Sequence, residues 1–238
     1  MTHLTRYLIV FIILPLFTAG LLAQAKSKGT LTFEVTDVTT NSPEMQQMVG
    51  AMKGMTQKLE FDDKRQKMTM DMMGGMMLIK TYTDTDKKST ETYMDMMGQK
   101  IKTVVSNAEI EKAQKEAGVM IKSDDIVYDK SVRKEVMGKD CYKATLQLDN
   151  NGQKVNMEMY VTDDIQVPTS FIQNLNQVQL QGTPLMWIID VGMMKMTFVA
   201  TEITDDLASD FFSKPEGDYQ EMSMEQLKQM GMGGQMGF

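Results

Sequence analysis

Apolar residues alternate with polar residues along most of this chain, a pattern typical of strands that bury one face. In residues 29–38, for example, Leu31, Phe33 and Val35 are separated by polar neighbours. The same alternation predicts further strands at 56–62, 67–73, 76–84, 90–97, 99–106, 185–190 and 193–203. These patterns predict a mainly β protein in which antiparallel strands follow one another.

A Gly74-Gly75 pair separates two of these segments and is well suited to a two-residue hairpin loop. Such a loop places Met72 opposite Met77 and Met70 opposite Ile79. One face of this hairpin is therefore predicted to carry Met68, Met70, Met72, Met77 and Ile79.

Asn151-Gly152 is a strong signal for a type I′ turn, and folding the chain there pairs Leu146 with Met157 and Ala144 with Met159. All apolar residues of this second hairpin then share one face. Cys141 falls on the opposite, polar face, which predicts a partly exposed thiol. The sheet as a whole is expected to have one wet face and one apolar face.

Four segments have helical patterns. Residues 44–55 place Met45, Met48, Val49, Met52 and Met55 on one stripe. Asn107 is a predicted N-cap for residues 108–117. Residues 170–179 are expected to form a short helix with Phe171, Leu175 and Val178 inward. Residues 224–230 follow a Ser223/Gln226 capping box.

The N-terminal residues 1–25 have the form of a secretory signal peptide. Arg6 precedes the apolar stretch 8–14, and the segment ends in Ala23-Gln24-Ala25. We expect cleavage after Ala25 and a periplasmic or secreted protein. No cysteine follows to carry a lipid anchor, and no later segment is apolar enough for stable membrane insertion. Residues 26–222 are expected to form one domain, and residues 223–238 a short helix and a flexible Met/Gly-rich tail.

The amino-acid composition excludes several kinds of catalytic and metal-binding site. The chain has 27 methionines among 238 residues, one histidine, one cysteine and a net charge of −7. The histidine, His3, lies in the leader, so the mature chain lacks the imidazole that catalytic triads and His-ligated metals need. The adjacent acidic pairs at 124–125, 163–164 and 205–206 are typical of turns. We therefore expect a protein that is not an enzyme, has no cofactor and does not bind nucleic acid.

Several short motifs resemble those of an uncharacterised family of exported bacterial envelope proteins. They lie at 134–144, 160–165, 182–185, 194–196 and 215–219, within a likeness that spans most of residues 29–222. This family is similar to the LolA/LolB-like lipoprotein-carrier superfamily. The resemblance implies a curved antiparallel sheet that forms an incomplete barrel, with short helices over its concave face. It also implies a lipid or lipoprotein-like hydrophobic cargo, and it maps no catalytic residue.

Three functions follow from these patterns. The first is a binding protein whose concave face holds a lipid or other hydrophobic ligand, because flexible thioether side chains adapt to varied shapes. Its candidate ligand-binding residues are Met48, Met52, Met68, Met70, Met72, Met94, Met96, Met157, Met159 and Trp187. The second is a structural envelope protein in which the same residues fill a closed core. The third is a Cu(I) or Ag(I) binding protein that uses the tail residues Met230, Met232 and Met236.

Overall fold

The computed structural model describes residues 25–72, 74–116, 121–150, 153–172, 175 and 178–229. Their strands are β1 Gly29–Thr40, β2 Thr56–Phe61, β3 Arg65–Met72, β4 Met77–Asp84, β5 Ser89–Met96, β6 Gln99–Ser106, β7 Ile126–Val136, β8 Lys139–Asn150, β9 Gln153–Thr162, β10 Thr183–Asp190, β11 Met194–Thr204 and β12 Gln220–Glu221. The helices are η1 Pro43–Met45, α1 Gln46–Met52, α2 Asn107–Glu116, η2 Ser123–Asp125 and α3 Met224–Gln229.

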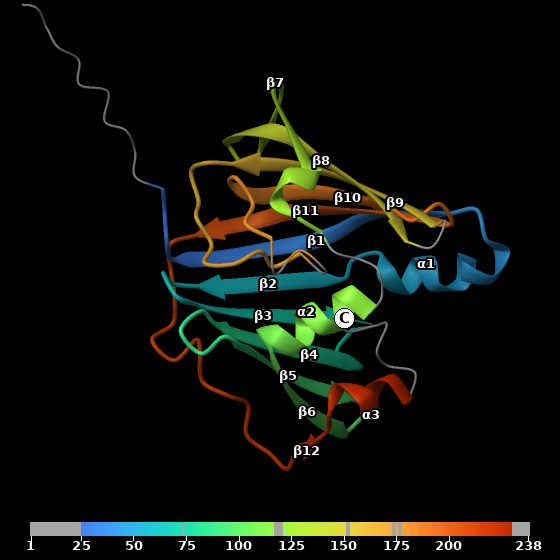
Figure 1. The fold of residues 1–238 in the computed structure, drawn as a ribbon, viewed down its shortest axis with the longest axis vertical. Helices are drawn as coiled ribbons and strands as arrows, with labels where there is room; N and C mark the ends of the chain where they lie inside the picture. The colour runs from blue at the N-terminus through green and yellow to red at the C-terminus, as the bar shows by residue number, and fades with distance from the viewer. Residues whose placement is uncertain are drawn as a thin grey trace, which may run out of the picture.

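All twelve strands belong to one sheet in the order β12-β6-β5-β4-β3-β2-β1-β11-β10-β9-β8-β7. Neighbouring strands are antiparallel except β12, which runs parallel to β6. Figure 1 shows β7 at one extreme of the molecule and β12 at the other. Because the two end strands do not pair, the sheet is an incomplete barrel, and the predicted fold class is confirmed.

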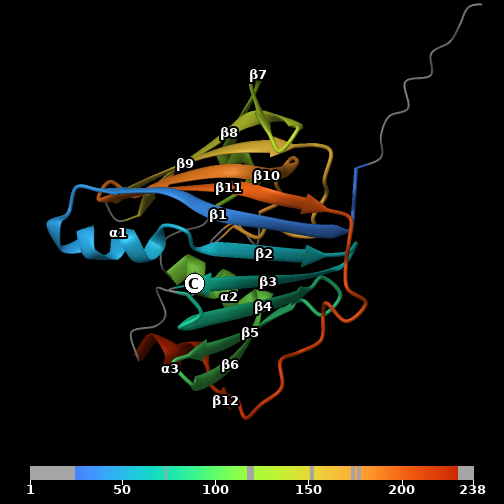
Figure 2. The same ribbon diagram turned by 180° about the vertical axis from the view of Figure 1, so that it is seen from behind.

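The predicted registers are also confirmed. In the first hairpin Met72 lies opposite Met77 and Met70 opposite Ile79. In the second hairpin Leu146 pairs with Met157 and Ala144 with Met159. The methionines of both hairpins therefore lie on one face of the sheet, which we call the inner face. In Figure 1 this face is turned toward the viewer and α2 lies across it, whereas Figure 2 shows the outer face.

The helices agree with the sequence patterns in three of four segments. The predicted helix at 44–55 is realised as η1 followed by the shorter α1, and α2 begins at Asn107. Ser223 and Gln226 form the expected reciprocal cap of α3. In 170–179, by contrast, the described residues form no helix: Leu175 N–H donates to Ile172 O and Val178 N–H to Leu175 O. These isolated turns still bury the three residues expected to point inward, Phe171, Leu175 and Val178.

Two hydrophobic cores lie mainly on the inner face, although the first also includes Cys141 from the outer side of β8. The first core covers β1, β2 and β7–β11 and is closed by the segment 165–180, which contributes Ile165, Phe171 and Leu175. The second core is smaller and contains Ile79, Met94, Ile101, Met222 and Leu227. Because Met222 and Leu227 come from the C-terminal part of the chain, α3 packs against the inner face of β4–β6.

Residues 205–223, here called the strap, connect β11 to α3 around the outside of the sheet (Figures 1 and 2). On the outer face the strap residue Lys214 lies 3.9 Å from the ring centre of Tyr82 and 3.3 Å from a carboxylate oxygen of Glu91. The Tyr82 hydroxyl donates to Ser213 O at 2.9 Å. Burial lowers the pKa of Lys214 and raises the pKa of Tyr82 to about 12. The strap is therefore held by an aromatic and cationic cluster before it crosses to the inner face.

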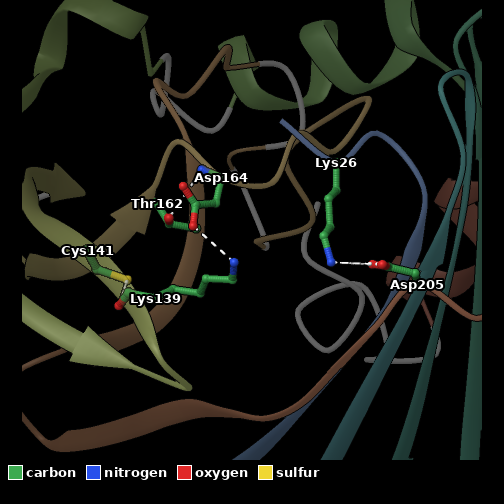
Figure 3. A network of polar contacts seen from close by, with 6 residues as sticks. All are labelled: Lys26, Lys139, Cys141, Thr162, Asp164 and Asp205. Atoms are coloured by element: carbon green, nitrogen blue, oxygen red, sulfur yellow. Dashed lines mark hydrogen bonds and ion pairs between the residues drawn. The ribbon is translucent and has the colours of Figure 1, made fainter. Parts of the chain in front are cut away.

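Cys141 was expected to be partly exposed, and this prediction is wrong: its exposed fraction is 0%. Cys141 shares the outer side of its strands with Thr162 and Thr183, as the register requires. The chain then folds back over this end of the sheet, where Thr183 donates to Ile165 O at 2.8 Å. Figure 3 shows the polar contacts of this region, which include ion pairs between Lys139 and Asp164 and between Lys26 and Asp205. Cys141 and Ile165 belong to the same buried cluster, so tertiary packing at this end of the sheet buries a position that alternation alone assigns to solvent.

Gly182 lies at the entry to β10 with a positive φ of 83°. A Cβ atom there would lie 2.7 Å from Thr162 O, so neither the backbone conformation nor the space suits a side chain. We expect Gly182→Ala to lower the free energy of unfolding by about 2 kcal/mol in urea denaturation. Gly50→Ala is the control, because a Cβ at Gly50 in α1 meets nothing within 4 Å and alanine favours a helix. Equal effects of the two substitutions would contradict this interpretation.

Candidate ligand-binding face

Nine of the ten residues predicted to bind a ligand have described side chains, and they separate into a buried group and a partly buried group. Met157, Met159 and Trp187 have exposed fractions of 7%, 0% and 2% and belong to the first core. Met94 is equally buried in the second core. Met52 and Met68 pack partly buried against the first core, and Met70, Met72 and Met96 do so against the second core.

Trp187 is the centre of an aromatic cluster in the first core. Its ring stacks on Phe198 with 4.8 Å between ring centres, and it meets Phe33 edge-on at 4.9 Å and Phe171 at 5.7 Å. Such contacts fill the space above Met159, which lies directly opposite Trp187 on β9. At this position the inner face is packed by protein side chains.

Seven of the partly buried methionines lie on α1, just before β2 and on β3–β5, and each packs against the first or the second core. We call them the methionine band; its members are Met52, Met55, Met68, Met70, Met72, Met77 and Met96. Strand β3 is the boundary, since Met68 packs against the first core and Met70 and Met72 against the second. Helix α1 contributes Met52, and α2 and α3 lie nearby on the inner face (Figure 1).

The band presents sulfur and methylene groups, and polar residues lie beside it on the same face: Gln57 is opposite Met70, Thr81 is opposite Met68 and Gln99 is opposite Met96. The one polar contact to a described thioether is a hydrogen bond of 3.3 Å from the Gln57 side-chain amide to Met70 Sδ. Gln57 lies directly opposite Met70 on β2, so this contact fixes the sulfur toward β2. The band is therefore a group of soft thioethers with polar side chains at its borders.

Sequence reasoning left Met55 and Met77 out of its candidates, although the Gly74-Gly75 register already places Met77 beside Met72. Two other groups of candidates lie outside the described residues. Met48 belongs to α1, but its side chain is not described. The proposed metal ligands Met230, Met232 and Met236 lie wholly outside the described part of the chain.

The acidic pairs have structural partners. Asp125 accepts a hydrogen bond from Lys122 N–H, Asp163 accepts one from the Tyr142 hydroxyl, and Asp164 pairs with Lys139 at 3.0 Å. Within the described residues no three His, Cys, Asp or Glu side chains come together as a metal-binding group. These carboxylates thus act in turns and ion pairs.

A pocket of about 450 Å³ lies between residues 163–170 and 178–183, with Ala25 at its wall. Sequence reasoning did not anticipate it, because it forms between two segments, 163–170 and 178–183, that are separated in the sequence. The side-chain oxygens of Thr169 and Ser170 are buried there without a hydrogen-bond partner among the described residues. Buried hydroxyls of this kind usually bind water, so this pocket suits small polar molecules better than an apolar chain.

In the described part of the chain, none of the helices has both the length and the hydropathy needed to cross a membrane. No protein-family model matches the sequence, and no curated protein matches it.

Three solved structures share a distant likeness with the chain. The Mycobacterium tuberculosis lipoprotein LppX aligns with a TM-score of 0.39 and 9% identity over 77% of this chain and 90% of its own. LprF from Mycobacterium bovis aligns with a TM-score of 0.36 and 10% identity over 80% of this chain and 90% of its own. A beta-barrel-like protein of domain of unknown function DUF1849 from Brucella abortus aligns with a TM-score of 0.31 and 13% identity over 76% of this chain and 98% of its own. Likenesses this slight say nothing about the ligand of this chain.

Proposed function

We propose that this chain is an exported, non-enzymatic binding protein that holds a lipid or another hydrophobic ligand against the methionine band. The observation that carries the proposal is the band itself, which both cores leave incompletely covered. Burying such a surface is favourable by roughly 25 cal/mol for each Å² of apolar area removed from water. The residues that hold the ligand are Met52, Met55, Met68 and Met70, whereas Met157, Met159 and Trp187 form the packed part of the same inner face.

Export follows from the predicted signal peptide at 1–25. Lys26 N–H donates to Asp164 O at 2.9 Å, and Lys26 O accepts from Gln166 N–H at 2.8 Å. A new amino terminus at Lys26 would keep the first of these contacts, so cleavage after Ala25 is compatible with the fold. Residues 26–222 then constitute the binding domain. Amino-terminal sequencing of the exported protein tests this point, and a first residue other than Lys26 would move the cleavage site.

Native mass spectrometry of protein purified without detergent tests whether the protein carries a ligand. We expect an apolar adduct that organic extraction removes, identified by analysis of the extract. Reproducible absence of any adduct would refute the carrier function and support the alternative of a closed, structural protein.

Binding should depend on the apolar character of the band. Gln has almost the length of Met but carries a polar amide whose burial is unfavourable. We expect Met52→Gln with Met68→Gln to weaken binding of the extracted lipid, or of a fluorescent fatty-acid probe, by about tenfold. Met137→Gln is the matched control, since Met137 is an exposed methionine in the β7–β8 turn, outside the band. Equal losses in both proteins would show that the band is not the site.

A further inference from the structure

Three methionines of the band occupy one line across three neighbouring strands. Met72 on β3 lies directly opposite Met77 on β4, and Met77 lies directly opposite Met96 on β5. We call these three residues the methionine row. All three side chains are on the inner face and are partly buried. The row is thus a fixed set of three thioethers that remains accessible.

The spacing of the row suits a three-coordinate metal ion. Neighbouring strands lie about 4.8 Å apart, so Met77 starts near that distance from both Met72 and Met96, whereas Met72 and Met96 start about 9.6 Å from each other. Three sulfurs around one ion at metal–sulfur distances of about 2.3 Å are separated from each other by about 4 Å. Met side chains have three rotatable bonds, so the two outer side chains can bend toward Met77 and bring all three sulfurs to this separation.

The donor set of the row is soft and uncharged. The next residue in the same line is Gln99 on β6. The acidic neighbours Asp71 and Asp95 point to the other face by strand alternation, and each accepts a backbone hydrogen bond in its own hairpin turn, from Gly75 and Gly98. Thioethers without carboxylates disfavour Mg²⁺, Ca²⁺ and Zn²⁺ and select Cu(I) and the chemically similar Ag(I).

Two more methionines lie at the open end of the row, in the turns of the two hairpins. Met76 and Met97 are 48% and 83% exposed, and Met97 N–H donates to Met76 O at 3.1 Å. Packing does not account for either side chain. Met97 also adopts a positive φ of 52°, a conformation that costs a non-glycine residue about 1–2 kcal/mol. An exposed thioether is thus maintained at an unfavourable backbone position beside the row.

We propose that Met72, Met77 and Met96 bind one soft monovalent cation, Cu(I) or Ag(I), and that Met76 and Met97 are the thioethers through which the ion enters. On the protein side of the row, Met94 and Met222 are buried in the second core and exclude water from the ion. The site is distinct from the tail residues Met230, Met232 and Met236. It does not require a lipid in the band.

The test is a titration of the full mature chain with Ag(I), followed by competition for Cu(I) with a chromogenic chelator under reducing conditions. We expect one ion per chain. The variant Met72→Leu/Met77→Leu/Met96→Leu should lower the affinity by about a hundredfold, and each single substitution by about tenfold. Leucine keeps the apolar volume of the row, so circular dichroism of the variants should be unchanged.

Two control variants locate the ion. Met137→Leu removes another exposed methionine, which like Met97 has a φ of 52° and precedes a glycine, but which lies in the distant β7–β8 turn. Met230→Leu/Met232→Leu/Met236→Leu removes the tail sulfurs. Both should bind Ag(I) as the unaltered chain does. Unchanged affinity in the row variants, or a loss confined to the tail variant, would overturn the proposal.

The same variants separate this site from the proposed lipid function. Leucine substitutions in the row remove sulfur but keep apolar area, so lipid binding should persist while Ag(I) binding is lost. Met52→Gln with Met68→Gln should do the reverse. A protein without a lipid adduct whose row still binds Ag(I) would refute the carrier function alone.

Discussion

Replacing Trp187 by alanine is expected to lower the free energy of unfolding by about 3–5 kcal/mol, the largest effect of any single substitution considered for this chain. The ring is 2% exposed and contacts Phe33, Phe171 and Phe198 from three different parts of the chain. The surrounding strands are fixed by their pairing and can close only part of the resulting cavity.

Urea denaturation followed by circular dichroism measures this loss, because the variant has no tryptophan for fluorescence. Val127→Ala is the control, since Val127 is an apolar strand residue that is 65% exposed. We expect the control to change stability by less than about 0.5 kcal/mol. A loss of less than about 1 kcal/mol for Trp187→Ala would mean that the first core is not closed over the sheet and that the ligand-binding surface extends to Trp187.

The Cys141 thiol is expected to react with a maleimide or disulfide reagent about a thousandfold more slowly in the folded chain than an exposed thiol at pH 8. Burial raises the pKa of Cys141 from 9.0 to about 11, which lowers the fraction of reactive thiolate. Because Cys141 is fully buried, the reagent cannot reach the sulfur and the reaction slows further. Val127→Cys in a Cys141→Ala background provides the exposed reference thiol, and denaturant should abolish the difference.

The same pKa shift links Cys141 to stability. Because the thiol pKa is higher in the folded chain than in the unfolded chain, its contribution to stability is complete below pH 9 and is lost as the pH rises toward 11. We expect Cys141→Ala to remove this part of the alkaline loss of stability. Rapid labelling of Cys141 at pH 8 in the absence of denaturant would show that the packing around Cys141 opens readily.

The registers of the two methionine hairpins could be predicted because local turn residues determine them. Gly74-Gly75 and Asn151-Gly152 define the loop length, and with the loop length every opposing pair is determined. The sequence could thus identify which residues share a face. It could not show what covers that face, since the covering residues, such as Phe171 and Leu227, come from distant segments.

Because the sequence does not show which distant residues cover a face, it could not separate the buried candidates from the partly buried ones. Strand alternation places both Met72 and Met159 on the inner face. The aromatic cluster around Trp187 buries Met159, however, while Met72 remains partly accessible. The same lack of information about distant residues explains the error at Cys141, which tertiary packing buries in the same cluster as Ile165 although its strand has the pattern of an exposed face. The ligand-binding roles of the band residues remain predictions, because burial alone does not identify what they contact.

The two ends of the open sheet are protected in different ways. The β6 edge is covered by the two residues of β12, which the strap brings into parallel pairing. The β7 edge lacks such a cover among the described residues, but it has a register break between Asp129 and Arg133 and exposes Lys130, Arg133 and Lys134. Short edge strands, irregular pairing and lysines all hinder the addition of a strand from another molecule. An incomplete barrel can therefore stay open to a ligand without its edges recruiting further copies into a fibre.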